Sequence, residues 1–158
     1  MKFKIITTNT PEYQAARMLR WEVLAKPLGM PPESEVLPEE MQSLHLIALD
    51  GKRIVGCICF HPESNENGRI FEIAVSEEYQ GHGFARQLLH ALERILIQKG
   101  FQNVFLFAIP EMEEFYCLMG YQPQEEIIMK RGVQQRMMKK NLPLENSMAH
   151  SEFTNLGF

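Results

Sequence analysis

The chain has 158 residues, 45% of them hydrophobic, and a formal net charge of −4. This size and composition predict one compact domain and argue against a disordered chain. Proteins that bind nucleic acid are more often basic, so we expect a different kind of partner. The alternative is a nucleic-acid-binding module that uses a basic segment of the chain. Such a module would bind oligonucleotides with a strong salt dependence. The residues of the segment are Lys130, Arg131, Arg136, Lys139 and Lys140.

The sequence also bears on location and on metal content. No apolar run approaches the roughly 20 residues of a transmembrane helix. The apolar part of residues 1–7 is too short for a signal peptide, so we expect a cytoplasmic protein with no membrane partner. Cys57 and Cys59 have the spacing of one strand face, and no second ligand pair stands at a useful spacing from them. We therefore expect no metal site.

The N-terminal elements follow from local signals. Residues 2–7 alternate in character and predict a strand. Thr10 is a suitable N-cap and Pro11 suits the first helical position, so a helix is expected from there to about Lys26. Residues 27–34 contain three prolines and a glycine, which exclude a regular helix or an inner strand. This loop either walls a pocket or is a plain surface connection.

The middle of the chain predicts an antiparallel meander with strands at residues 44–49, 53–60 and 69–75. Asp50 and Gly51 form a strong signal for a two-residue hairpin turn between the first two strands. A second turn is expected at residues 65–68, which are rich in asparagine and glycine.

The C-terminal half predicts a helix at 83–99, a strand at 103–109, a short helix at 111–119 and a hairpin of strands 125–129 and 133–139. Because a helix crosses over between them, the strands that end at Val75 and Ala108 should be parallel near neighbours. The expected fold is α/β of the α+β type, with a mixed, mostly antiparallel sheet of about six to seven strands flanked by helices. We expect one domain over residues 1–140 and a tail over 141–158, where no clear period is visible.

The most informative feature is the turn that joins the strand ending at Val75 to the helix that follows. Gly81 and Gly83 leave this turn without side chains, and the helix begins directly after it. A helix start presents unpaired N–H groups and the positive end of the helix dipole, which suits a phosphate or pyrophosphate. A P-loop would need a Gly-Lys-Ser/Thr ending, which is absent. A dinucleotide fingerprint would need a third glycine, where Arg86 stands instead.

Two motifs resemble the GNAT superfamily of acyl-CoA-dependent N-acetyltransferases. Gln80-x-x-Gly83-x-Ala85 is similar to the family's Gln/Arg-x-x-Gly-x-Gly/Ala signature between the fourth strand and the next helix. Residues 115–121, Phe-Tyr-Cys-Leu-Met-Gly-Tyr, are similar to the family's Phe-Tyr-x-x-x-Gly-Phe segment after the fifth strand. The motifs occur in the family's order and cover about residues 70–121, whereas the N-terminal part resembles the family only in the order of its elements.

The resemblance implies that acetyl-CoA is the co-substrate and that the glycine turn holds its pyrophosphate. In the family, the strand before this turn splays from its neighbour, and the pantetheine arm pairs with the exposed backbone, here at Ile73 and Val75. An N–H near Val75 would then stabilise the oxyanion. Arg86 either neutralises phosphate or is solvated, and of His82 only the amide is expected to matter. The expected cofactor-binding residues are Ile73, Ala74, Val75, Gln80, Gly81, His82, Gly83, Phe84, Ala85 and Arg86.

Acyl transfer to an amine requires one proton to leave the ammonium and one to reach the departing thiolate. By the resemblance, Tyr116 is the expected general acid; the alternative is an amphipathic core tyrosine. Glu72 is the expected base because it interrupts an apolar strand, on the same side as Ile70 and Ala74, where a carboxylate is costly unless it is paired or functional. The alternatives are a salt-bridged Glu72, a water chain, or one of Glu111, Glu113 and Glu114.

One departure from the family is visible. Many members carry an Asn that contacts coenzyme A six residues before the Phe of the second motif, where this chain has Ile109, followed by Pro110. We expect an N-acetyltransferase that moves the acetyl group of acetyl-CoA to a primary amine by direct attack in a ternary complex. The alternative is a non-catalytic acyl-CoA-binding regulatory module. Direct attack needs no acyl-enzyme, so Cys117 is interpreted as a packing residue.

The acceptor is a small molecule or a peptide amine that the sequence does not identify. An acidic run either attracts a cationic amine or is solvated surface, and its residues are Glu33, Glu35, Glu39 and Glu40. The resemblance also implies that terminal strands can mediate a homodimer.

Overall fold

The computed structural model describes residues 1–32 and 39–144, and within them seven strands form one mixed sheet in the order β1-β2-β3-β4-β5-β7-β6. All neighbouring strands are antiparallel except β4 and β5. This confirms the predicted α+β class and the parallel crossover. The strands are β1 (Lys2–Ile6), β2 (Leu44–Asp50), β3 (Arg53–Pro62), β4 (Asn67–Val75), β5 (Asn103–Ala108), β6 (Gln122–Lys130) and β7 (Val133–Asn141).

The helices lie between the strands at the places the sequence predicts, with boundaries that shift by a few residues. They are α1 (Pro11–Arg20), α2 (Phe84–Gln98) and α3 (Glu113–Leu118), with short helical turns at η1 (Trp21–Ala25), η2 (Lys26–Leu28), η4 (Glu40–Gln42), η5 (Glu77–Tyr79) and η6 (Pro110–Met112). The first helix does not continue regularly to Lys26: it ends at Arg20 and passes into the π-helical turn η1. Among the described residues, none of the helices combines the length and apolar character that crossing a bilayer requires.

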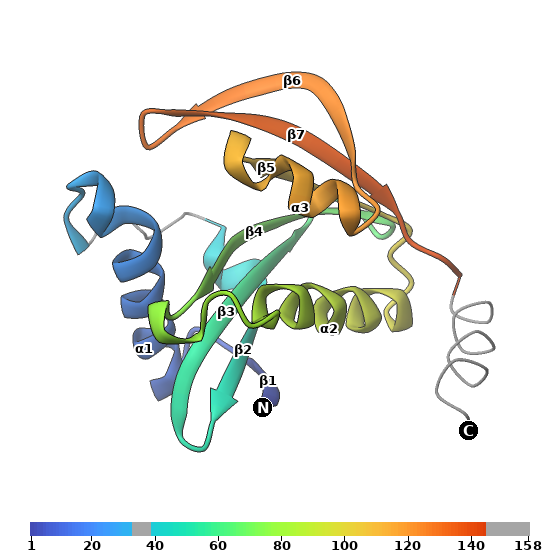
Figure 1. Ribbon diagram of the computed structural model, residues 1–158. Coiled ribbons are helices and arrows are strands. Elements are labelled where there is room, and N and C mark those ends of the chain that lie inside the picture. The colour runs from blue at the N-terminus through green and yellow to red at the C-terminus, as the bar shows by residue number, and fades with distance from the viewer. Residues whose placement is uncertain (33–38, 145–158) are drawn as a thin grey trace.

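Helices cover the two faces of the sheet, so the molecule has three layers (Figure 1). Leu46 and Ile47 are adjacent on β2 and point to opposite faces, because side chains alternate along a strand. Leu46 belongs to the core cluster that contains the apolar residues of α2. Ile47 belongs to the cluster that contains Tyr13, Ala16 and Leu19 of α1. Each helix therefore buries its apolar stripe against a different side of the same strands.

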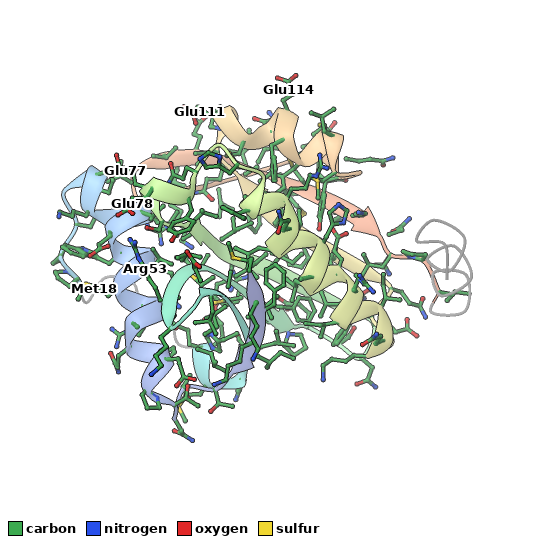
Figure 2. All side chains as sticks on the ribbon, turned by 60° about the horizontal axis from the view of Figure 1, so that its bottom comes forward. Met18, Arg53, Glu77, Glu78, Glu111 and Glu114 are labelled. Carbon is green, nitrogen blue, oxygen red and sulfur yellow. The ribbon has the colours of Figure 1, made fainter. Side chains whose placement is uncertain are left out.

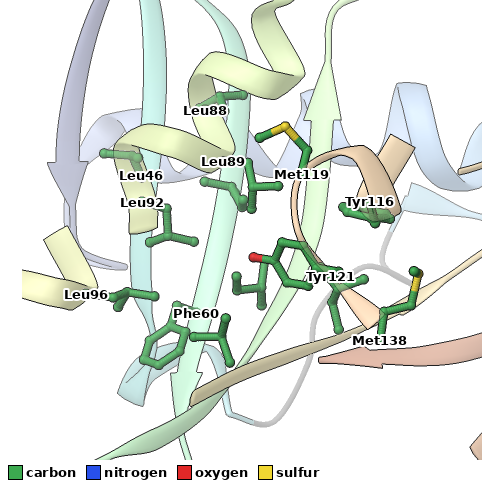
Figure 3. Packing of buried hydrophobic residues seen from close by; sticks show 14 of the residues in the cluster. Leu46, Phe60, Leu88, Leu89, Leu92, Leu96, Tyr116, Met119, Tyr121 and Met138 are labelled. Atoms are coloured by element: carbon green, nitrogen blue, oxygen red, sulfur yellow. The ribbon is translucent and has the colours of Figure 1, made fainter. Parts of the chain in front are cut away.

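Helix α2 is the main packing element on its face. Its leucines at positions 88, 89, 92 and 96 are fully buried, which is the stripe that the sequence predicts. Figure 3 shows them above Phe60 of β3, beside Tyr121 and Met138. Each such side chain contributes about 1.5–3 kcal/mol through burial alone. This packing fixes the start of α2, and with it the glycine turn, relative to β4.

The parallel pair β4–β5 is short. The two strands pair only where Asn67–Arg69 of β4 lie beside Asn103–Phe105 of β5, and beyond these residues they separate. The rest of β4, through Val75, therefore pairs with β3 on one side only. This is the opening that the family resemblance implies.

Strand β4 also carries a bulge at Glu72. Phe71 pairs with Cys59 and Ala74 with Cys57, so β4 has one residue more than β3 over this stretch. Glu72 is the extra residue, and its φ of 53° lies in the left-handed region. The bulge reverses the alternation of side chains: Ile70 packs on the α2 side, whereas Ala74 packs on the α1 side. The expectation that Ile70 and Ala74 share a face was therefore wrong, because it assumed an unbroken period of two.

Candidate active site

The opening between β4 and β5 forms a cleft of about 1090 Å³. Its walls come from β4, the glycine turn, the start of α2, the end of β5, α3, and the β6–β7 hairpin. Of the expected cofactor-binding residues, all but His82 line it. His82 is exposed and lies beside Phe84, with 6.3 Å between the two ring centroids. The structure thus gathers residues from distant parts of the chain around one cavity.

The glycine turn has the geometry of an anion site. Gly81 and Gly83 have φ values of 80° and 82°, and no atom lies within 4 Å of where a Cβ would stand on either residue. Gly83 caps α2, whose first hydrogen bond runs from the Gln87 N–H to the Gly83 carbonyl. The N–H groups of the first helical turn therefore have no partner within the helix, and the positive end of the dipole lies at the cleft.

A side-chain contact ties the turn to the strand. The Gln80 amide nitrogen donates to the carbonyl oxygen of Val75 at 2.8 Å. This bond fixes the distance between the anion site and the end of β4. The side chain of Gln80 thus supports the site from within the protein. Its backbone N–H donates to the Glu77 carbonyl at 3.2 Å, so the N–H groups offered to a ligand are those further along the turn.

The backbone of β4 faces the opening in the way that the resemblance implies. The Ser76 N–H donates to the Val55 carbonyl on β3 at 2.8 Å. Because successive N–H groups point to opposite sides of a strand, the Val75 N–H points away from β3, toward the opening. The same alternation directs the Ile73 N–H toward the opening. A ligand lying between β4 and β5 can therefore pair with β4 as an additional strand.

Tyr116 of α3 lines the cleft and is 5% exposed. Its ring packs edge-on against Tyr121, with 5.8 Å between the centroids. Tyr121 is itself held by a hydrogen bond of 2.6 Å to Glu93, which Lys140 contacts at 2.9 Å. Within the described residues, no group bonds the Tyr116 hydroxyl. Burial raises the pKa of Tyr116, so the hydroxyl keeps its proton at neutral pH.

Glu72 lies in the same cleft and is buried, as the sequence predicts, but it is ion-paired. The Arg131 guanidinium donates to both of its oxygens, at 2.8 and 3.0 Å, and the Lys130 ammonium approaches at 2.5 Å. Arg20 approaches from the α1 side, with 3.9 Å between its Nε and Glu72 Oε2. These cations stabilise Glu72 as a carboxylate. The salt-bridged alternative therefore describes its state.

The other candidate bases differ in position. Glu111 lines the cleft but is exposed, and Glu114 projects into solvent from α3 (Figure 2). Glu113 pairs with Arg136 at 3.4 Å. Among the described residues, Glu72 is the one buried carboxylate in the wall of the cleft.

The four glutamates of the acidic run do not form one exposed surface in the described part of the structure. Glu33 and Glu35 lie outside the described residues. Glu39 pairs with Arg69. Glu40 is 2% exposed, so it cannot attract a substrate from solvent. That expectation was wrong for Glu40 because its carboxylate is bound inside the protein.

Glu40 belongs to a buried network that the sequence did not indicate. Arg20 donates to its two oxygens at 2.8 and 2.9 Å, and the Tyr13 hydroxyl donates at 2.7 Å. His45 binds the Glu40 backbone oxygen at 2.8 Å. A signal that could have revealed it is the place of Arg20 on the same face of α1 as Tyr13 and Ala16, because an arginine buried on an apolar face needs a carboxylate partner.

The proline-containing loop contributes to the wall of the cleft. Pro27 and Leu28 line it together with Val23 and Leu24 of the preceding turn. For the part of the loop that is described, the pocket-wall alternative is therefore correct. Ile109, at the position of the family's Asn, lines the cleft with an apolar side chain. No group of three or more metal-binding side chains occurs within residues 1–32 and 39–144.

Comparisons with known proteins agree with this architecture. A putative N-acetyltransferase from Lactobacillus plantarum superimposes with a TM-score of 0.79 at 25% identity, over 90% of this chain and 100% of that one. An aminoglycoside 6'-N-acetyltransferase complexed with coenzyme A shares the fold, with a TM-score of 0.75 at 16% identity, over 90% of this chain and 98% of that one.

Two curated relatives match at the sequence level. The uncharacterized N-acetyltransferase YjcF of Bacillus subtilis is 25% identical over 138 residues, 87% of this chain and 98% of that protein. The chloroplastic GCN5-related N-acetyltransferase 2 of Arabidopsis thaliana is 31% identical over 75 residues, which span 48% of this chain but only 29% of that protein. The model of the acetyltransferase (GNAT) family matches residues 13–121. The chain therefore belongs to the GNAT family of acetyltransferases.

Proposed function

We propose that the chain transfers an acetyl group from acetyl-CoA to a primary amine by direct attack in a ternary complex. One observation carries the proposal: β4 separates from β5 and turns its free N–H groups toward a cleft that has an anion-binding turn at one end and Tyr116 in its wall. That cleft provides separate places for a pyrophosphate, an extended amide-containing arm and a reacting thioester.

Each part of the cofactor meets complementary groups. The N–H groups of the glycine turn and the first turn of α2 bind the pyrophosphate, and Arg86 adds positive charge near it. The pantetheine amides pair with the backbone of Ile73 and Val75. An N–H that β4 directs into the opening near Val75, beyond those paired with the arm, donates to the thioester carbonyl and stabilises the oxyanion that forms during attack. The solved aminoglycoside acetyltransferase with bound coenzyme A supports this choice of co-substrate.

The chemical step makes one bond and breaks another. The neutral amine nitrogen attacks the carbonyl carbon, and the bond between that carbon and the cofactor sulfur breaks. The departing thiolate takes the proton of the Tyr116 hydroxyl, which burial keeps protonated. The nitrogen of the new amide then loses its extra proton, which returns to the Tyr116 oxygen, so that the products are a neutral amide and a free thiol. A water molecule carries the ammonium proton to solvent before the attack, because Glu72 is buried and Lys130 and Arg131 already hold its oxygens.

The test is thiol release from acetyl-CoA in the presence of a panel of amines. Replacing Tyr116 with Phe should lower turnover by about 10²-fold or more, because a positioned general acid contributes this much. Coenzyme A affinity, measured by calorimetry, should be unchanged, because the hydroxyl acts on the sulfur only as the bond breaks.

Two outcomes would contradict the proposal in different ways. Unchanged turnover in Tyr116→Phe would remove the general-acid role. Tight coenzyme A binding with no thiol release across a broad amine panel would instead identify a non-catalytic binding module.

A further inference from the structure

A buried cluster of three polar residues lies behind the wall of the cleft and joins separate parts of the fold. Glu93 of α2 accepts a hydrogen bond of 2.6 Å from the Tyr121 hydroxyl on one oxygen. Its other oxygen accepts one of 2.9 Å from the ammonium of Lys140 on β7. The side chains of Glu93 and Lys140 are 5% and 19% exposed, and Tyr121 is 2% exposed. None of the three residues, which form the Glu93 cluster, lines the cleft.

Stability alone does not account for a buried ion pair at this place. Glu93 lies on α2 among fully buried leucines, which are Leu89, Leu92 and Leu96. The cost of removing two charges from water offsets most of what their attraction contributes, and apolar residues of similar volume are often at least as stabilising. What the hydrogen bonds of Glu93 add is direction, because they fix the orientation of the groups that they join.

The Glu93 cluster holds the C-terminal end of α3. This helix has only six residues, and a helix so short has little stability of its own. The last carbonyl groups of a helix also need donors from outside it. The Lys140 ammonium donates to the Met119 carbonyl at 2.8 Å. The Tyr121 N–H donates to the Tyr116 carbonyl at 2.9 Å. Gly120 lets Lys140 come this close, because a Cβ there would lie 3.2 Å from the lysine Cε.

The same cluster bears on the direction of the Tyr116 ring. The rings of Tyr116 and Tyr121 meet edge to face, with 5.8 Å between their centroids (Figure 3). No hydrogen bond within residues 1–32 and 39–144 holds the Tyr116 hydroxyl, so packing sets the direction of its ring. The Tyr121 ring cannot tilt away without breaking its bond to Glu93. Burial, and then the charge of Glu93, raise the pKa of Tyr121, so its hydroxyl remains a donor at neutral pH.

We propose that the Glu93 cluster is a positioning device for Tyr116. Glu93 and Lys140 hold Tyr121 and the end of α3, and Tyr121 holds the Tyr116 ring in the direction that lets its hydroxyl reach the cofactor sulfur. This inference rests on the proposed N-acetyltransferase function and adds to it three residues that touch neither substrate. Because these residues act through Tyr116, their loss slows the chemical step and leaves cofactor binding as it is.

The experiment is a double-mutant cycle between Tyr121→Phe and Tyr116→Phe. Thiol release from acetyl-CoA is measured with the fastest acceptor among n-butylamine, benzylamine, spermidine and leucinamide. Tyr121→Phe removes one hydroxyl and keeps the ring, and kcat should fall by about tenfold, because a small misplacement of a reacting group can cost up to about 10²-fold. The KM for acetyl-CoA should be unchanged. In the Tyr116→Phe background, Tyr121→Phe should lower kcat no further, since residues that act as a unit are not additive.

Matched controls separate positioning from stability. Tyr13→Phe also removes a buried hydroxyl that donates to a carboxylate, at 2.7 Å, but Tyr13 packs in the cluster on the α1 side of the sheet. It should lower the midpoint of thermal unfolding much as Tyr121→Phe does and leave kcat unchanged. Lys140→Met should also lower kcat, with no further loss in the Tyr116→Phe background, and it carries the test if Tyr121→Phe does not fold. Lys139→Met, at an exposed lysine of β7, should change nothing.

The outcomes separate the inference from the function on which it rests. Losses of kcat that multiply in the double variant, or an equal loss of kcat in Tyr13→Phe, overturn the positioning role while acetyl transfer stands. A raised KM for acetyl-CoA with unchanged kcat in Tyr121→Phe does the same. Unchanged kcat in Tyr116→Phe overturns the general-acid role and this inference with it. Thiol release by the wild-type protein with none of the four amines overturns the proposed function itself.

Discussion

The buried pair of Arg20 and Glu40 predicts a large loss of stability when one charge is removed. Their side chains are 1% and 3% exposed, and two hydrogen bonds of 2.8 and 2.9 Å join them. Glu40→Gln keeps the shape but removes the negative charge, and its amide group turns a donor toward a guanidinium that also donates. Tyr13 then competes for the one oxygen that remains.

The expected magnitude follows from burial. Removing one partner of a buried ion pair costs about 3–5 kcal/mol because the remaining charge is desolvated and no longer balanced. For a chain of 158 residues, about 1 kcal/mol corresponds to roughly 2–4 °C, so the midpoint of thermal unfolding should fall by about 6–20 °C. Urea unfolding at pH 7, followed by circular dichroism, measures the free energy directly.

The chain offers a matched control on its surface. Arg53 donates to both oxygens of Glu78 at 3.1 Å, but both residues are exposed (Figure 2). Glu78→Gln should leave the unfolding midpoint unchanged, since exposed pairs contribute little. Equal effects of Glu78→Gln and Glu40→Gln, or a loss below about 1 kcal/mol for Glu40→Gln, would refute the argument from burial.

Two further predictions concern the glycine turn and alkaline pH. Gly83→Ala should destabilise the fold by about 1–2 kcal/mol and should weaken coenzyme A binding in calorimetry. The control is Gly100→Ala, just after the other end of α2, where φ is 91°: it should cost as much stability but leave coenzyme A binding unchanged. An equal loss of coenzyme A binding in both variants would contradict the anion-site role of the glycine turn. Burial raises the pKa of Cys57 from 9.0 to about 12 and helps to raise that of Tyr13 from 10.0 to about 12. Above about pH 9 these groups lose their protons in the unfolded chain but keep them in the folded protein, so their contribution to the free energy of unfolding is lost as the pH rises toward 12. The midpoint of urea unfolding should therefore decrease between pH 8 and pH 10.5. A midpoint that does not change with pH would contradict the burial of these groups.

The sequence predicted what depends on local signals. The turn at Gly81 and Gly83 was visible because a short run of residues determines its conformation, and the stripe of α2 was visible because one helix carries it. The crossover helix then required β4 and β5 to be parallel. The opening between these strands was expected only from family resemblance, because no residue in either strand specifies where pairing stops.

The contacts of Glu72 could not be predicted in the same way. Its partners Lys130 and Arg131 lie 58 and 59 residues further along the chain, and composition does not say which of several cations meets which carboxylate. The bulge at Glu72 also broke the alternation from which its neighbours were placed. A buried carboxylate was foreseeable from the apolar surroundings, but its ion-paired state required the three-dimensional arrangement.

The strand order β5-β7-β6 has a consequence for how the site matures during synthesis. Strand β6 is made before β7, yet β7 lies between β6 and the rest of the sheet, so β6 has no edge to join until β7 has emerged. The cofactor turn, completed by residue 98, can assemble on the ribosome while the chain is still growing. The pairing of Lys130 and Arg131 with Glu72 must wait for the whole hairpin. The glycine turn can thus take its position before the ion pairs of Glu72 with the hairpin exist.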